Sequence, residues 1–408
     1  MQRVRMSLPY FKTFGWDAEV VTVNEIYSEV IKDDLLLQSV PADIKVHKVE
    51  ALNKTWTAKF GLGSLALRSM WYYRKKVNQL LKNQKFDLIY FSTTQFPLCI
   101  LGAYWKKRFG IPYVVDMQDP WHSDYYKDKP KEEQPAKYWF SYRLNKYLEP
   151  LAMKQVAGLI SVSQNYIDDL KARYPVIKNI KSLTLPFGAF KPDLEIARAH
   201  EADFEPLLDT KYTNIVYIGR GGADMYLALN VVFGAFKKAL DEHPETLKKI
   251  RFHFLGTSYA PSDQGKQTVL PVAKQHGIEQ YVVEQTNRIS YYHTLITLQQ
   301  AHALFIPGSD DPKYTASKIY PYILTNKPVL ALFNERSPAL QVLKEYGVQF
   351  AYSFNSTPDI DYKLSVFFSL LVSGNIPEQH YAESAIERYS AKNMAKQQCQ
   401  FFDEVMSQ

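Results

Sequence analysis

Two loops in the C-terminal half of the chain carry residues that could bind phosphate. In the first, an apolar run (214–218) leads into Gly219, Arg220, Gly221 and Gly222, and a helical pattern follows to residue 240. Glycines let backbone N–H groups approach a ligand, a helix N-terminus attracts anions, and arginine offers a fork of donors to phosphate oxygens. The spacing does not fit the Gly-x-Gly-x-x-Gly dinucleotide motif. The alternative is a strand-to-helix turn whose glycines only relieve strain.

The second loop lies between two later apolar runs, within residues 305–333. It offers hydroxyl groups and one cation, from Ser309, Tyr314, Thr315, Ser317 and Lys318. Pro321 suits the first turn of a helix, so we expect a helix to begin near Ser317 or Lys318 with its N–H groups toward the loop. The alternative is that these polar residues only cap that helix. If both loops follow strands of one sheet, they line the same cleft and predict a site for a phosphate-bearing ligand.

A third polar loop, VVDMQDPWHSDYY (114–126), follows an apolar run in the N-terminal half. It combines carboxylates, an imidazole and aromatic rings, in Asp116, Asp119, His122, Asp124 and Trp121. Such a set could hold a polyhydroxylated ligand, and a carboxylate or imidazole could act as a general base. The alternative is a connector in which Asp119-Pro120 starts a turn. Zinc-peptidase, Walker and Gly-x-Ser-x-Gly motifs are absent, so no metal site is predicted.

The composition is that of a globular protein long enough for two domains. The chain has 408 residues, 46% hydrophobic and 22% charged, with a formal net charge of +7 and only two cysteines, Cys99 and Cys399. Two distant cysteines argue against a disulfide framework and suit a reducing cytoplasm. No apolar run approaches the roughly 20 residues of a membrane span. The basic residues are scattered, which does not favour a nucleic-acid-binding module.

Compact apolar runs predict two successive series of buried parallel strands. The first series comprises residues 18–23, 86–92, 112–117 and 158–163; the second comprises 214–219, 250–256, 281–284, 303–308 and 328–333. Helical patterns, such as 65–84, separate the runs. This alternation predicts an α/β protein with two doubly wound, Rossmann-like domains facing each other across a cleft.

The predicted domain boundaries follow from the same pattern. The first domain covers 1–187, the second 188–380, and a terminal helix in 381–408 packs back on the first domain. The segment LPFGAFKPD (185–193) has the composition of a hinge. We expect the domains to close over a bound donor, because the reacting groups must be shielded from water.

The order of these segments resembles bacterial GT-B-fold glycosyltransferases of the family four type. The resemblance rests on VVDMQDPW (114–121), LPFGA (185–189), YIGRGG (217–222) and SKIYPYILTNKPVLAL (317–332). It implies an N-terminal acceptor domain, a C-terminal nucleotide-sugar domain and metal-independent transfer with retention at the sugar carbon. The residues assigned on this basis are Asp119, Arg220 and Lys318 as catalytic; Gly219, Gly221, Gly222, Ser309, Tyr314, Thr315 and Ser317 as donor-binding; and Gln118, Trp121 and His122 on the acceptor side.

The chain departs from the family pattern at several of these positions. The family carries a lysine shortly after the arginine, and here that position is Met225. Two family glutamates before the KPV strand fall on Lys313 and Pro321, and the histidine of the family His-Asp pair is Gln118. Lys318 could substitute for the missing cation.

The resemblance therefore implies a cytoplasmic glycosyltransferase of surface polysaccharide or glycolipid synthesis. Its substrates would be a UDP- or GDP-linked sugar and a glycan or lipid-linked acceptor, without a cofactor or nucleic acid. Two alternatives remain, a non-catalytic nucleotide-sugar or glycan-binding homologue and a sugar-nucleotide 2-epimerase. A peripheral membrane contact through Arg68, Arg74, Lys75 and Lys76 is also possible on the predicted helix 65–84, against the alternative of a solvated helix face.

The beginning of the chain predicts one further feature. Compared with the family, residues 1–14 read as the first helix, so the strand that precedes this helix is missing from the sheet. A missing central strand leaves backbone groups unpaired. On this reading we expect that the natural protein starts upstream of Met1.

Overall fold

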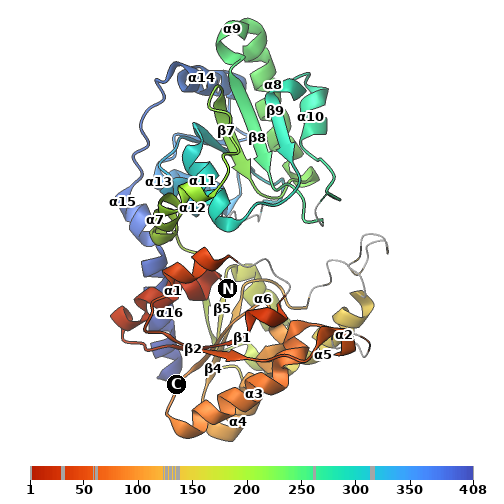
Figure 1. Cartoon of the computed structure of the whole chain (residues 1–408), viewed down its shortest axis with the longest axis vertical. Helices are drawn as coiled ribbons and strands as arrows, with labels where there is room; N and C mark the ends of the chain where they lie inside the picture. The colour runs from red at the N-terminus through yellow and green to blue at the C-terminus, as the bar shows by residue number, and fades with distance from the viewer. Residues whose placement is uncertain are drawn as a thin grey trace. The chain divides into compact units, whose positions relative to one another are not determined.

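The structure is a computed structural model of the chain (Figure 1). It describes residues 2–28, 33–57, 59, 63–122, 124, 127, 131, 134, 138–260, 263–312 and 318–407. The chain forms two compact units: a first unit of Met1–Asp34, Ser39–Gly188 and Ala391–Gln408, and a second unit of Leu35–Gln38 and Ala189–Ser390. The sequence predicted domain boundaries after residues 187 and 380. In the structure the chain passes from one unit to the other after Gly188 and after Ser390.

The second unit is built on a six-stranded parallel sheet in the order β12-β11-β10-β7-β8-β9. Its strands are β7 (Thr213–Ile218), β8 (Ile250–Leu255), β9 (Val282–Gln285), β10 (Ala303–Pro307), β11 (Val329–Phe333) and β12 (Phe350–Ser353). The chain adds β8 and β9 on one side of β7, then returns and places β10 on its other side. The strand order therefore reverses between β7 and β10, where α/β sheets bind ligands.

Helices in the second unit bury apolar residues against this sheet. They are α7 (Lys191–Ala199), α8 (Tyr226–Glu242), α9 (Pro244–Leu247), α10 (Leu270–Gln275), α11 (Tyr291–Gln300), α12 (Ile319–Leu324), α13 (Pro338–Tyr346), α14 (Ile360–Ser373) and α15 (Glu383–Arg388). In α8, Val232, Phe233 and Phe236 are fully buried. The Phe236 ring lies 5.1 Å from that of Phe252 in β8. The apolar residues of α8 recur with the helical period of 3.6 residues, as they do in the sequence. The helix predicted after the glycine-rich loop is therefore confirmed.

The sheet of the first unit is divided into two pieces. One consists of β1 (Glu19–Val23) and β2 (Lys45–Val49); the other has β3 (Ile89–Ser92), β4 (Tyr113–Met117), β5 (Gly158–Ser161) and β6 (Lys181–Thr184) in that order. In the part of the chain that the structure describes, β1 pairs only with β2, and β3 pairs only with β4 within its sheet. One edge of each of these two strands is therefore unpaired. Every residue of these two strands is only partly buried, although most are apolar.

The helices of the first unit are α1 (Gln2–Phe11), α2 (Lys54–Thr57), α3 (Leu65–Asn83), α4 (Ile100–Phe109), α5 (Tyr138–Met153), α6 (Gln164–Arg173) and α16 (Ala391–Met406). The predicted terminal helix is thus two helices, since α15 belongs to the second unit and α16 to the first. Helix α16 packs on α1 (Figure 1). The Phe402 ring lies 6.2 Å from that of Phe11 and 5.2 Å from that of Trp16.

Candidate functional site

The two predicted phosphate loops meet at the carboxyl end of the sheet in the second unit. They follow β7 and β10, which are adjacent parallel strands. The Asp310 amide donates a hydrogen bond of 2.8 Å to the Asp224 carbonyl. Lys318 Nζ, at the end of the second loop, lies 3.1 Å from the Tyr217 hydroxyl of β7. The sequence prediction that both loops belong to one place in the fold is therefore correct for the residues that the structure describes.

Gly219 leaves the space that the Lys318 side chain occupies. Its φ is +154°, a conformation that side chains rarely adopt, and a Cβ at this position would lie 1.5 Å from Lys318 Nζ. The same ammonium lies 4.8 Å from the centre of the Tyr217 ring. The glycine after β7 therefore allows a lysine from another loop to reach the end of this strand.

Lys318 belongs to a group of three cations. Burial, followed by the charges of Arg288 and Arg220, lowers the pKa of Lys318 from 10.5 to about 8. Arg288 was not predicted; it lies in the loop after β9, and its guanidinium stands 4.5 Å from the centre of the Tyr259 ring. Its position just beyond the end of an apolar run was the signal that could have found it. The group has the charge that a diphosphate requires.

Arg220 is oriented by a carboxylate four residues further on. Its Nη1 and Nη2 donate to Asp224 Oδ1 and Oδ2 at 2.9 and 2.7 Å. Burial opposes ionisation of Asp224, but the hydrogen bonds and charge of Arg220 prevail and lower its pKa, and a hydrogen bond from the buried Ser309 lowers it further. A Cβ on Gly222 would lie 2.4 Å from Arg220 Nη1, so this glycine makes room for the pair.

Some backbone donors of the glycine-rich loop are already used. The Gly219 and Gly221 amides donate to the Leu255 and Thr257 carbonyls, each at 2.9 Å. A ligand could use the predicted Gly221 donor only by breaking this bond. The predicted donor residues Tyr314, Thr315 and Ser317 lie outside the described residues.

The predicted acceptor-side residues of the first unit lie directly after β4, and most of them are buried. Asp119 is exposed, whereas Gln118, Trp121 and His122 are buried. Trp121 Nε1 donates to Asn145 Oδ1 at 3.1 Å, and its ring stacks on Phe96 at 5.6 Å. Packing and a hydrogen bond therefore hold the indole in the core of the first unit, and a contact between Trp121 and a ligand stays a prediction.

His122 lies in a buried polar cluster. Its amide donates to Glu149 Oε1, and its carbonyl accepts from Arg173 Nη1. Arg173 also pairs with Glu149 at 2.6 Å. Burial, then the charge of Arg173, lowers the pKa of His122. Neither ring nitrogen has a hydrogen-bond partner among the described residues.

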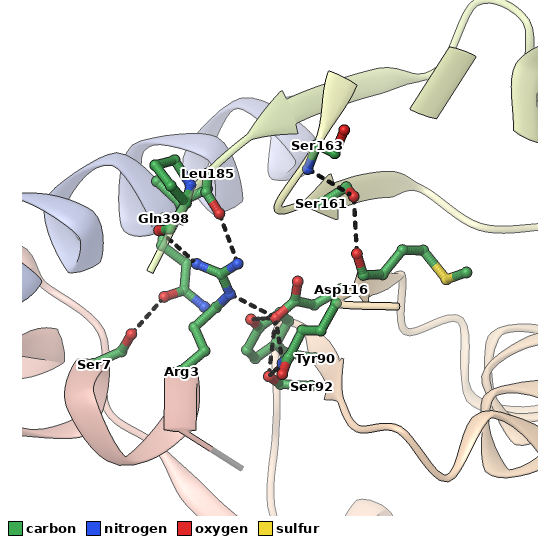
Figure 2. A network of polar contacts seen from close by, with 12 residues as sticks. Arg3, Ser7, Tyr90, Ser92, Asp116, Ser161, Ser163, Leu185 and Gln398 are labelled. Atoms are coloured by element: carbon green, nitrogen blue, oxygen red, sulfur yellow. Dashed lines mark hydrogen bonds and ion pairs between the residues drawn. The ribbon is translucent and has the colours of Figure 1, made fainter. Parts of the chain in front are cut away.

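A second buried network surrounds Asp116 near the carboxyl end of β4 (Figure 2). Asp116 Oδ2 accepts from Arg3 Nε at 2.7 Å, Tyr90 OH at 2.9 Å and Ser92 Oγ at 3.0 Å. Gln118 Nε2 donates to the same oxygen at 2.9 Å and to Ser92 Oγ at 2.7 Å. Gln118 is thus held by the network, and Asp116, a predicted ligand contact, is enclosed by it.

Neither a metal cluster nor a membrane span is found in the described part of the chain. No group of three or more His, Cys, Asp or Glu side chains there could hold a metal ion. No helix in that part is long and apolar enough to cross a membrane.

Comparison with known families identifies part of the chain directly. Residues 41–182 match the family model described as Glycosyltransferase Family 4. HepE from Anabaena, solved in complex with UDP, is similar in structure with 16% sequence identity, a TM-score of 0.52, and coverage of 98% of this chain and 94% of that one. The chain has the GT-B fold, and residues 41–182 are family-4-like. The predicted resemblance is confirmed to this extent.

Two other solved structures are similar to the chain. The N-terminal domain of Candida albicans trehalose-6-phosphate phosphatase is 12% identical over 100% of this chain and 92% of that one, with a TM-score of 0.52. A UDP-forming trehalose-phosphate synthase from Burkholderia xenovorans is 11% identical, with a TM-score of 0.47 and coverage of 82% and 77%. No curated protein sequence matches the chain.

Proposed function

We propose that the protein transfers a sugar from a nucleotide-sugar donor to a glycan or lipid-linked acceptor in surface-polysaccharide synthesis. The observation that carries this proposal is the group of Arg220, Arg288 and Lys318 at the strand reversal of the second unit. Two of these cations come from loops after adjacent strands, and Asp224 orients the guanidinium of Arg220. A diphosphate offers the oxygens and the charge that complement them.

The chemical role of these cations follows from where charge develops. When the bond between the sugar carbon and the diphosphate breaks, the electron pair stays on the diphosphate oxygen. The acceptor hydroxyl oxygen forms the new bond to the sugar carbon and loses its proton. Oriented cations in a partly desolvated site stabilise the departing diphosphate more strongly than water does. We assign this stabilisation to Arg220 and Lys318, without a divalent metal and with retention at the sugar carbon.

The acceptor would bind to the first unit near the end of β4. Asp119 follows this strand and its carboxylate is exposed, so it is our candidate to accept the hydroxyl proton. Gln118 would have a positioning role on the acceptor side, since its side chain is held by a hydrogen bond to Asp116. Both cysteines of the chain are free and buried in this unit, which suits the reducing cytoplasm that we propose as its location.

Calorimetric titration with UDP and GDP tests the donor site. We expect one of them to bind, and Arg220→Ala to weaken binding at least tenfold, since hydrogen bonds between charged groups contribute about 1.5–3 kcal/mol. Arg336→Ala is the matched control, because Arg336 is an exposed arginine of the same unit outside the three loops. Equal affinity of the Arg220→Ala and wild-type proteins would refute the proposed cradle.

A non-catalytic binding homologue is the second candidate. The family lysine position is Met225, whose side chain is buried in the core and carries no charge. Incubation with a UDP-sugar and a panel of acceptor glycans distinguishes the two functions. Transfer supports the enzyme, and nucleotide binding without any turnover supports the homologue. Conversion of the UDP-sugar without an acceptor would instead indicate an epimerase.

A further inference from the structure

Helices α3, α4 and α5 lie next to one another in the first unit (Figure 1). The Trp105 ring of α4 stacks on Phe91 of β3 at 6.1 Å, and Trp105 Nε1 donates to Asn78 Oδ1 of α3. The Phe91 ring also contacts Tyr113 of β4, whose hydroxyl donates to the Ala152 carbonyl of α5 at 2.6 Å. Helices α3, α4 and α5 therefore turn their inner sides to the same sheet face, and we call their outer side the helical face.

The helical face concentrates the positive charge of the protein. The three helices contain ten Lys and Arg residues and one acid, Glu149. The whole chain has 49 basic and 42 acidic residues, so 39 basic and 41 acidic residues remain elsewhere. The helices thus carry +9, and the rest of the chain carries −2. The single acid is buried and paired with Arg173, so it does not offset the surface charge.

The exposed cations follow the outer stripe of each helix. They are Arg74, Lys75 and Lys82 on α3, Lys107 and Arg108 on α4, and Arg143 and Lys146 on α5. None of these seven pairs with a carboxylate among the described residues. Arg68, which the sequence also suggested for this surface, is buried and donates to the Leu52 and Tyr27 carbonyls, so that part of the prediction is wrong.

Large aromatic side chains are interleaved with these cations. Trp71, Trp139 and Tyr147 are 58%, 64% and 68% exposed. On α5 the residues Trp139, Arg143, Tyr147 and Leu151 recur every fourth position, which places them on one stripe. Lys75 Nζ lies 5.2 Å from the centre of the Trp71 ring, and the Arg143 guanidinium lies 5.8 Å from that of Trp139.

We propose that the helical face docks on an anionic lipid surface. Tryptophan and tyrosine partition into the headgroup region of a bilayer, and lysine and arginine beside them attract anionic headgroups. A nucleic-acid duplex would need the cations but would gain little from a leucine and two tryptophans spread over α3 and α5. The combination of charge and apolar side chains on one face therefore favours a membrane.

Flotation with vesicles of phosphatidylcholine, alone or mixed with phosphatidylglycerol, tests the proposal. We expect the full chain to float with the mixed vesicles, and binding to fall as salt is raised. Lys75→Gln with Arg143→Gln should weaken binding about fivefold per cation removed. Trp71→Ser with Trp139→Ser should reduce binding while leaving its salt dependence.

The matched controls lie on the second unit. Lys274→Gln with Lys344→Gln, and Tyr362→Ser, change exposed residues of the same kinds, so they should float like the wild type. Equal loss in these controls, or equal flotation with pure phosphatidylcholine, would overturn the proposal. Displacement of the protein from mixed vesicles by a single-stranded RNA oligonucleotide, with no effect of the tryptophan changes, would show a nucleic-acid surface instead. The assay needs no nucleotide-sugar, so its outcome is independent of the proposed transfer.

Discussion

A lysine that lies over a tyrosine ring and near two arginines holds its proton less tightly than a lysine in water. At Lys318, burial is the larger cause and the charges of Arg288 and Arg220 add to it, so the pKa is about 8 instead of 10.5. Below pH 8 the residue is charged, and this charge destabilises the folded protein when no anion is bound. The destabilisation is relieved as the pH rises from 8 to 10.5, because the unfolded chain then binds more protons.

The same pKa predicts how nucleotide binding depends on pH. A bound diphosphate stabilises the charged lysine, so binding UDP requires proton uptake above pH 8. We expect the affinity measured by calorimetry to begin to fall as the pH approaches 8, where Lys318 of the free protein starts to lose its proton, and to fall further as the pH rises. Lys318→Arg should remove this fall, because arginine stays charged. A fall of the same size in the Lys318→Arg protein would mean that another group titrates.

At the scale of elements, helix α1 is fixed to the first unit by the Arg3 side chain. Arg3 is fully buried, and it donates to Asp116 Oδ2 of β4 and, through Nη2, to the Leu185 carbonyl at 2.7 Å (Figure 2). The Ser7 hydroxyl donates to Gln398 Oε1 at 2.8 Å, which joins α1 to α16. These contacts join segments from both ends of the chain to the end of β4, where Gln118 and Asp119 begin the candidate acceptor loop.

We predict that the buried pair of Arg3 and Asp116 is strongly coupled. Arg3→Met should lower the free energy of unfolding by about 3–5 kcal/mol, because it leaves a buried carboxylate without its cation. Asp116→Asn should also destabilise the protein, and the double variant should lose less than the sum of the two. Urea unfolding measures all three.

The exposed pair of Lys48 and Glu25, whose charged atoms are 2.8 Å apart, gives the control. Its removal should change stability little, since such pairs are screened by solvent. Additive effects of Arg3→Met and Asp116→Asn would contradict the predicted coupling.

At the scale of the whole molecule, the chain divides its two candidate sites between two units. The cation group lies in the second unit and the Asp116 network in the first. Ligand binding slows the opening of the segments that it stabilises. When the ligand concentration is a hundred times the dissociation constant, the stabilisation is about 2.7 kcal/mol. We therefore predict that UDP slows amide hydrogen exchange about 100-fold in residues 219–225, 286–290 and 308–312.

Mass spectrometry of the intact chain, with and without UDP, measures this exchange. The same residues should show no protection in the Arg220→Ala protein at the UDP concentration that protects the wild type. Strong protection confined to residues 92–122 would place the nucleotide in the first unit and reverse the assignment of the two sites.

The sequence alone determined the features that depend on neighbours along the chain. Near-continuous apolar runs predicted β1, β3, β4 and β5 and five strands of the second unit, because such runs are typical of the strands of parallel sheets. The adjacency of Gly219, Arg220 and Gly222 to such a run marked the first phosphate loop. The polar or short strands β2, β6 and β12 lack that signal, and they were not predicted.

Only the tertiary structure decided which of the marked residues are accessible and which act together. The types of Trp121 and Arg68 suggested surface roles, but contacts with Asn145 and with the Leu52 carbonyl bury both side chains. Arg288 and Lys318 follow different parallel strands of one sheet, whose loops lie at the same end of that sheet, and no local pattern encodes this arrangement. Burial, charge coupling and strand order depend on residues far apart in the sequence, so they are properties of the folded chain.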